Sequence, residues 1–275
     1  MFTFINSIDD LEFLNQELLK KDYLGVDTEF RRTRKDNMTL ALLQVNDGEE
    51  IYLIDTIQIQ NPDEKCSFLF SENVVKIIHS CKEDLEAVFS WTNKIMTNIF
   101  DTQLANSLLG KDYSIGYQGL VEQELEISLE KKETRSNWIR RPLSSSQLKY
   151  AALDVEYLPH IYLKQRHELI KSNKLDWYNE DINKLIDTSF NTNFILKVPL
   201  RSVPKSEENT LLREFNNIIE EISETEHINP TFFFSKKSQK DFLRLAITEG
   251  LDSALHSLTN WRQRLIKEKL SGLLS

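Results

Sequence analysis

The stretch YLGVDTEF, residues 23–30, decides the fold, because an apolar run ends there in two carboxylates one residue apart. Side chains alternate between the two faces of a strand, so Asp27 and Glu29 project on the same side. Two like charges on one face repel each other and lose hydration unless a cation lies between them. Taken alone, the pair is also compatible with a strand that ends at the surface with both groups in water.

The composition is that of a globular chain with an acidic excess in its larger, N-terminal part. The 275 residues are 40% hydrophobic and 28% charged, which predicts one large domain or a medium domain with a small one. Residues 200–275 carry 11 basic and 11 acidic side chains, so the net charge of −9 arises from residues 1–199. Part of this excess is expected at a metal site, where cations neutralise carboxylates.

Several classes of protein are disfavoured by what the sequence does not contain. With 7 glycines and neither G-x-G-x-x-G nor G-x-x-x-x-G-K, it has no pattern for a Rossmann dinucleotide site or a P-loop. Cys66 and Cys81 lack paired spacing and are predicted to be reduced core residues of a cytoplasmic protein. The early acids predict no signal peptide, and no apolar stretch approaches the roughly 20 residues of a membrane span.

Strand-like segments come first along the chain, and helices follow. Strands are expected at 1–5, 23–30, 40–46, 49–55 and 73–80, with Asp47-Gly48 as a hairpin turn. Helices are expected at 8–21, 83–91, 101–109, 116–125 and 145–171, the last bent near Pro159. This order predicts an α/β fold, a mixed sheet with helices on its faces.

The composition changes near residue 188. Residues 188–207 contain Asn, Ser and Pro without a clear period and are predicted to be a linker. Helices are expected after it at 208–224, 238–248 and 252–269. The predicted organisation is therefore a larger domain over residues 1–187 and a small helical domain over residues 208–275.

Two later segments add acidic residues in chemically significant places. HSCKEDLEAVF (79–89) puts Glu83 and Asp84 at a strand-to-helix junction, where the helix dipole alone could explain them. QLKYAALDVEYL (147–158) puts Tyr150 and Asp154 on one helical face, with Asp154 among apolar residues where an unpaired charge is costly. A plain Tyr–Asp contact is the alternative there. Converging carboxylates need cations, and hard oxygen ligands suit Mg²⁺ or Mn²⁺.

These blocks, in this order, resemble ribonuclease D, of the DEDDy branch of 3′-to-5′ exonucleases. The resemblance spans residues 1–170 and is carried by VDTEFRR (26–32), HSCKEDLEAVF (79–89), FDTQLANSLLG (100–110), GYQGLVEQ (116–123), KKETRSNWIRRPLS (131–144) and YAALDVEYLPHIY (150–162). It implies a ribonuclease H-like fold with two bound divalent metal ions. Its implied metal ligands are Asp27, Glu29, Asp84 and Asp154, with Tyr150 as the catalytic tyrosine.

The resemblance also implies a role for each of these residues. Asp27 is expected to bridge both ions, Glu29 and Asp154 to hold the ion that carries the attacking water, and Asp84 to serve the second ion. Tyr150 is expected to orient the water, because a phenol with a pKa of about 10 is a poor proton acceptor at neutral pH. His79, just before the third acid, is expected to be a core histidine.

The implied reaction is hydrolysis of RNA from its 3′ end to 5′-mononucleotides, with tRNA precursors as expected substrates and a monomer as the expected state. The tail resembles an HRDC domain, a helical nucleic-acid-binding unit, in INPTFFFSKKSQKDFLRLA (228–246) and LTNWRQRLI (258–266). Candidate RNA contacts are Phe30, Arg31, Lys131, Arg135, Trp138, Arg140, Arg141, Lys236 and Lys237. Each could equally be a solvated charge or a core ring. A DNA exonuclease and an inactive RNA-binding module are the alternative functions.

Overall fold

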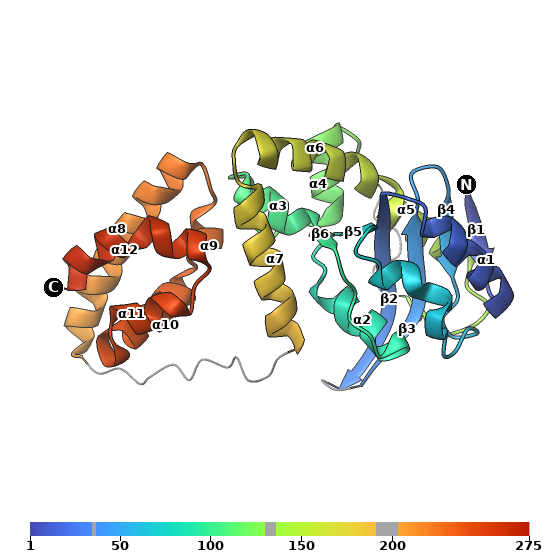
Figure 1. The fold of residues 1–275 in the computed structure, drawn as a ribbon, viewed down its shortest axis with the longest axis horizontal. Coiled ribbons are helices and arrows are strands. Elements are labelled where there is room, and N and C mark those ends of the chain that lie inside the picture. The colour runs from blue at the N-terminus through green and yellow to red at the C-terminus, as the bar shows by residue number, and fades with distance from the viewer. Residues whose placement is uncertain (35–36, 130–135, 191–202, 275) are drawn as a thin grey trace. The chain divides into compact units, whose positions relative to one another are not determined.

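The computed structural model describes residues 1–34, 37–129, 136–190 and 203–274, which form two compact units (Figure 1). The first unit comprises Met1–Gln103 and Ile115–His167 and contains the sheet. The second comprises Leu104–Ser114 and Glu168–Ser275 and is helical in its described part. None of the described helices combines the length and the apolarity that a membrane span requires.

The first unit is built on a six-stranded mixed sheet in the order β1-β4-β3-β2-β5-β6. The β2–β3 and β3–β4 pairs are antiparallel, and the β1–β4, β2–β5 and β5–β6 pairs are parallel. The predicted fold class is thereby confirmed. The strands are β1 (Phe2–Ile5), β2 (Tyr23–Arg34), β3 (Asn37–Asn46), β4 (Ile51–Ile54), β5 (Val75–Ile78) and β6 (Ile99–Asp101). The sequence pattern missed β6, which is too short to show an alternation.

The two central strands are longer than their apolar patterns. Their antiparallel ladder continues past the buried core to the pair Arg34–Asn37, so cross-strand pairing extends strand structure into a charged segment. The predicted turn between β3 and β4 is confirmed. Gly48 has φ of +91°, and Asp47 Oδ1 accepts hydrogen bonds from the backbone nitrogens of Glu49 (2.9 Å) and Glu50 (2.8 Å).

Helices α2 and α5 pack on β2 and β3 from opposite faces of the sheet. Thr28 contacts Asp84 of α2, whereas Gly25, three residues before Thr28 in β2, faces α5. A Cβ on Gly25 would lie 3.1 Å from Leu158 Cβ and 3.3 Å from the Val155 carbonyl oxygen. Glycine therefore lets the end of α5 approach β2 closely, beside the residues that follow Gly25 on the same face.

The α-helices of the first unit match the predictions with one correction, whereas the 3₁₀ helix over Asp63–Phe70 was not predicted. The predicted helix over 145–171 is two helices, separated at Tyr157, and Pro159 lies in the first turn of the second, where proline is tolerated. Ser7 caps the first helix by accepting from the Asp10 backbone N–H, as its sequence indicates. The helical elements are α1 (Ile8–Leu18), η1 (Asp63–Phe70), α2 (Lys82–Thr92), α3 (Thr102–Leu108), α4 (Tyr117–Leu125), α5 (Ser145–Glu156) and α6 (Leu158–Lys171).

In the second unit, a helix that the sequence analysis did not identify packs with the tail. Trp177 of this helix stacks on Trp261 at 4.7 Å with an interplanar angle of 4°, and Asp181 accepts from Trp261 Nε1 at 3.1 Å. The predicted helix over 252–269 is broken between His256 and Asn260. The helices are α7 (Leu175–Phe190), α8 (Lys205–Glu226), α9 (Pro230–Phe233), α10 (Lys236–Glu249), α11 (Leu251–His256) and α12 (Asn260–Leu274).

The predicted linker overlaps both neighbouring helices. Its first residues belong to α7, its last belong to α8, and residues 191–202 lie outside the described residues. Because α7 belongs with the tail helices in the second unit, the compact units divide the chain differently from the predicted domains. The domain boundaries at 187 and 208 stay a prediction.

Candidate active site

Three carboxylates from two elements meet on the α5 face of the sheet. Asp27 and Glu29 lie two residues apart on β2, and Asp154 lies on α5, with ligand oxygens within 4.8 Å of one another. The position of α5 is set at its start, where Ser144 and Gln147 form a reciprocal capping box. Strand alternation and helix capping therefore bring together residues that are more than 120 positions apart.

Asp84 approaches from the other side of β2. It lies in the first turn of α2, and its Oδ1 accepts a 2.5 Å hydrogen bond from the Thr28 hydroxyl. It is outside the close group of three, yet its charge acts on both Asp27 and Glu29. The structure thus places all four predicted carboxylates at one site, while their role as metal ligands stays a prediction.

Burial and mutual repulsion dominate the electrostatics of the site. Burial, followed by the charges of Asp84, Asp154 and Glu29, raises the pKa of Asp27 well above its ordinary value. Burial, followed by the charges of Asp154 and Asp84, raises the pKa of Glu29 to about 8, and burial raises the pKa values of Asp84 and Asp154 to about 7. Within the described part of the chain, none of the four forms a salt bridge with a lysine or arginine.

This donor set fits a divalent cation. Carboxylate oxygens are the hard ligands that Mg²⁺ and Mn²⁺ prefer, and a nearby positive charge favours the ionised form of a buried acid. Four acids that are buried or half-buried, with no cationic partner among the described residues, repel one another and are complementary to bound cations.

Tyr150 lies one helical turn before Asp154. Burial, and then the negative charges of Asp154, Glu29 and Asp27, raise the pKa of Tyr150 above its ordinary value, so the side chain is a neutral phenol. A hydrogen bond from Tyr150 opposes the raised pKa of Asp154. The ring is half-buried, with Trp138 at 6.2 Å between ring centroids. Tyr150 is thus held as a hydrogen-bond donor beside the acids.

A cavity of about 520 Å³ opens next to Tyr150 and Asp154, with Tyr117, Gln118 and Ser128 among its other lining residues. The hydroxyl of Tyr117 accepts a 3.0 Å hydrogen bond from the Tyr157 backbone nitrogen at the end of α5. This bond fixes one wall of the cavity to the helix that carries Tyr150. The sequence analysis did not single out Tyr117, although it lies within the block 116–123.

His79 is a satisfied core histidine, as predicted. Its Nε2 lies 2.9 Å from the Ile115 carbonyl oxygen, and its Nδ1 lies 2.9 Å from the Thr102 hydroxyl. A carbonyl oxygen only accepts, so Nε2 carries the proton and Nδ1 accepts from Thr102. Burial lowers the pKa of His79, which favours this neutral form. His79 holds the backbone that leads into α4 and does not reach the acids.

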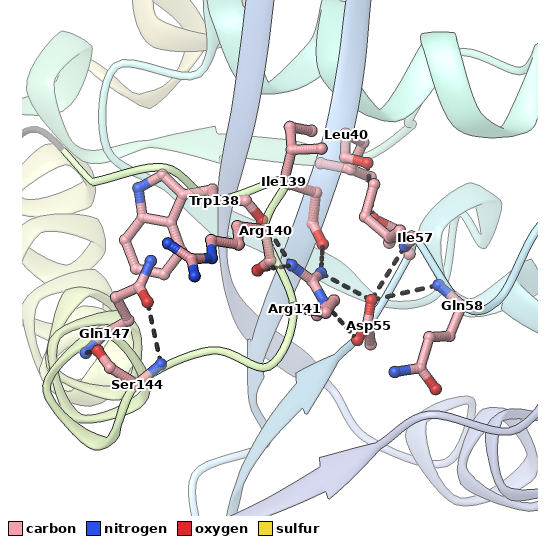
Figure 2. A network of polar contacts seen from close by, with 12 residues as sticks. Leu40, Asp55, Ile57, Gln58, Trp138, Ile139, Arg140, Arg141, Ser144 and Gln147 are labelled. Carbon is pink, nitrogen blue, oxygen red and sulfur yellow. Dashed lines mark hydrogen bonds and ion pairs between the residues drawn. The ribbon is translucent and has the colours of Figure 1, made fainter.

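Arg141 was predicted to contact RNA, but its guanidinium is bound within the protein (Figure 2). Its Nε and Nη2 donate to the two oxygens of Asp55 at 2.6 and 2.7 Å. Its remaining N–H groups donate to the carbonyl oxygens of Ala41 (2.7 Å), Trp138 (2.6 Å) and Arg140 (3.2 Å). All five donors of the guanidinium are engaged, so Arg141 is a structural clamp and has none left for a phosphate.

The other predicted RNA contacts differ in accessibility. Trp138 is only 7% exposed and packs beside Tyr150, so its burial argues against the predicted base stacking. Phe30 is half-buried, and Arg31 and Arg140 are exposed near the site. Lys131 and Arg135 lie outside the described residues. Lys236 and Lys237 are exposed at the start of α10, where Lys237 pairs with Asp241 at 2.9 Å.

Comparison with known proteins identifies the family of the first unit. A family model described as 3′-5′ exonuclease matches residues 2–170. Ribonuclease D of Pseudomonas paraeruginosa is 39% identical over 180 residues, which is 65% of this chain and 48% of the relative. Ribonuclease D of Xanthomonas oryzae is 42% identical over 165 residues, 60% of this chain and 46% of the relative. The chain therefore spans about half the length of the curated relatives it matches.

Solved structures share the fold. Escherichia coli RNase D, described as an exoribonuclease involved in structured RNA processing, matches all of this chain and 74% of its own with a TM-score of 0.66 at 24% identity. Brucella melitensis NrnC with bound Mg²⁺ matches 68% of this chain and 90% of its own with a TM-score of 0.59 at 20% identity. The family match over most of the sheet-containing unit settles the assignment: the chain belongs to the 3′-5′ exonuclease family.

Proposed function

We propose that the protein is a metal-dependent 3′-to-5′ exoribonuclease that releases 5′-mononucleotides. The observation that carries this proposal is a group of closely spaced, half-buried carboxylates, Asp27, Glu29 and Asp154, with the buried Asp84 beside them and no salt bridge to a lysine or arginine among the described residues. Such a group fits the divalent cations of a phosphodiester hydrolase. Membership of the 3′-5′ exonuclease family supports the direction of attack.

Asp27, Glu29 and Asp154 would hold two Mg²⁺ or Mn²⁺ ions, with Asp84 serving from α2. When bound, the two ions activate a water and stabilise the leaving oxygen of a phosphoryl transfer. Tyr150 donates a hydrogen bond that orients the reacting group, because its raised pKa makes the phenol a poor base. Trp138 packs against Tyr150 and restricts its ring.

The cavity beside Tyr150 is the place where a 3′-terminal nucleotide would lie. It provides aromatic and polar side chains, Tyr117, Gln118 and Ser128, within the same opening as Asp154. The exposed guanidinium groups of Arg31 and Arg140 are the candidates for phosphate contacts outside it. The ribonuclease D relatives favour RNA, and tRNA precursors are the proposed natural substrates.

The tail is proposed to be an HRDC-like RNA grip over residues 208–275, joined by the segment 188–207 to an exonuclease domain over residues 1–187. The exposed Lys236 and Lys237 support this role, because both stand at the start of α10 away from the buried side of the helix. We also propose that the protein is a monomer and lies in the cytoplasm. Both cysteines, Cys66 and Cys81, are buried, and neither forms a disulfide.

The test uses RNA and DNA of equal sequence, each with a 3′-hydroxyl or a 3′-phosphate, with Mn²⁺, Mg²⁺ or EDTA. We expect mononucleotide release from the 3′-hydroxyl RNA and none in EDTA. Equal rates on the 3′-phosphate or on circular RNA would exclude an exonuclease, and a preference for DNA would select the DNA exonuclease. Binding of RNA without cleavage under every condition would indicate the inactive binding module.

A matched pair of variants connects the activity to the site. Asp84→Asn removes a buried acid that hydrogen-bonds Thr28, whereas Glu83→Gln removes its neighbour, which is 64% exposed. We expect a large loss of activity from the first variant and nearly wild-type activity from the second. Equal losses would mean that the acids act through the start of α2 rather than through the site.

A further inference from the structure

Gln44 is a buried polar residue whose side chain has no hydrogen-bond partner among the described residues. It lies on β3 with no exposed surface, and neither its amide nitrogen nor its amide oxygen has a hydrogen-bond partner among the described residues. A buried amide without a partner costs about 1–3 kcal/mol. Its neighbours Leu42, Leu43 and Val45 are apolar and fully buried, so packing alone would favour an apolar residue at this position.

The sheet register places Gln44 beside the acidic site. Gln44 pairs with Asp27 across the antiparallel β2–β3 ladder. Directly opposite residues point to the same face, with about 4.5–5.5 Å between their Cβ atoms, so the amide and the carboxylate are within reach of each other. Asn46, two residues along the same face, donates to the carbonyl oxygens of Val155 (2.9 Å) and Glu156 (3.0 Å), so this face is the one that α5 covers.

The two polar residues of this face of β3 are thus treated differently. Asn46 uses its amide to hold the end of α5, whereas the amide of Gln44 is left without a protein partner next to Asp27. A carboxylate that binds a cation usually receives a hydrogen bond from a neighbouring group, which fixes its orientation. An N–H group also binds an ionised carboxylate more strongly than a neutral acceptor.

We propose that Gln44 is a positioning residue for Asp27, and that its amide N–H donates to the Asp27 carboxylate when the site holds divalent cations. This inference rests on the proposed metal-dependent function. The unsatisfied amide is then the donor that the Asp27 carboxylate uses when cations are bound. Gln44 acts through Asp27 and touches neither substrate nor cation.

The test measures metal affinity and stability without RNA. Gln44→Met and Gln44→Leu replace the amide side chain with an apolar side chain of similar volume. We expect Mn²⁺ affinity, measured by calorimetry, to fall about 10–100-fold. Stability to urea in EDTA should be equal to that of the wild type or higher, because an unsatisfied amide is removed.

Gln165→Met is the matched control. Gln165 is another fully buried glutamine of the same unit; its Nε2 donates to the Thr102 carbonyl oxygen at 3.1 Å, and only its Oε1 has no partner among the described residues. This variant should lose stability and keep wild-type Mn²⁺ affinity. If Gln44→Met and Gln44→Leu bind Mn²⁺ as the wild type does, or unfold in EDTA, the role given to Gln44 is wrong.

The same titration separates this inference from the proposed function. A wild-type protein without measurable Mn²⁺ affinity would refute the metal site and the role of Gln44 together. A wild-type protein that binds Mn²⁺ with no difference from the Gln44 variants would refute only the role of Gln44. Activity on 3′-hydroxyl RNA then serves as a further readout and should fall with the affinity.

Discussion

Two regions of one sheet bury aspartates in opposite ways. Asp55, at the end of β4, is fully buried and receives two hydrogen bonds from Arg141 and others from the backbone nitrogens of Ile57 and Gln58 (Figure 2). Asp27, on β2, is half-buried among like charges. Among the described residues, Asp55 has an arginine partner and Asp27 has no lysine or arginine partner, which distinguishes a charge-paired structural acid from one suited to bind a cation.

The compensated region also supports the uncompensated one. Arg141 holds the carbonyl oxygens of Trp138 and Arg140, and this segment leads into the Ser144 cap that starts α5 (Figure 2). Tyr150 and Asp154 follow on that helix. The ion pair of Arg141 and Asp55 thus helps to fix the start of the helix that carries Asp154, whose charge is repelled by the acids of β2.

The largest expected effect comes from removing a charge of the uncompensated region. Asp27→Asn keeps the shape of the side chain and removes a ligand charge worth several kcal/mol in the transition state, so kcat should fall on the order of 10⁴-fold. Single-turnover cleavage of labelled RNA measures this loss. Circular dichroism should show an unchanged fold, and retention of more than a tenth of the activity would contradict the role of Asp27.

The next effect comes from breaking the compensated pair. Arg141→Met leaves Asp55 buried without its cation, and such a change typically costs about 3–5 kcal/mol of unfolding free energy. Urea unfolding in EDTA measures it without any contribution from metal. The double variant Arg141→Met, Asp55→Asn should lose less than the sum of the two single variants. Additive losses would show that the pair is not coupled.

A comparable effect is expected from Tyr150, through a different mechanism. Tyr150→Phe keeps the ring and every carboxylate, so Mn²⁺ affinity should stay near that of the wild type while kcat falls on the order of 10²–10⁴-fold. Calorimetry and single-turnover kinetics on the same preparation test this. Weakened Mn²⁺ binding, or full activity, would assign Tyr150 to structure alone.

The acids of the site could be predicted from the sequence because their spacing is local. Asp27 and Glu29 are two apart in a strand, and Tyr150 and Asp154 are four apart in a helix, so each pair reports its own geometry. The apolar runs in β2 and β3 likewise indicated the central sheet. Even so, only the resemblance of the sequence blocks, in their order, to ribonuclease D indicated that the two pairs belong to one site.

Arg141, Trp138 and Gln44 could not be assigned in the same way. Arg141 is one of many basic residues in the sequence, and only the fold shows that Asp55, 86 residues away, engages its guanidinium. From the sequence, Trp138 is compatible both with a surface that stacks on bases and with the core, and in the structure it is buried. Gln44 interrupts an apolar strand, which is a visible signal, but its neighbour Asp27 follows from a register that no local pattern specifies.

In the smallest expected effect, neutralising an acid changes the unfolding free energy in opposite directions in the two regions. In EDTA at pH 8, Asp154→Asn removes one charge from a group of repelling acids, so the unfolding free energy should rise by about 1–2 kcal/mol. Asp55→Asn should lower it, because that carboxylate has an arginine partner. Saturating Mn²⁺ at 100 times its Kd should stabilise the wild type by about 2.7 kcal/mol and Asp154→Asn by less, which reverses their order. If Asp154→Asn is the less stable protein in EDTA, Asp154 is a structural residue and the contrast with Asp55 fails.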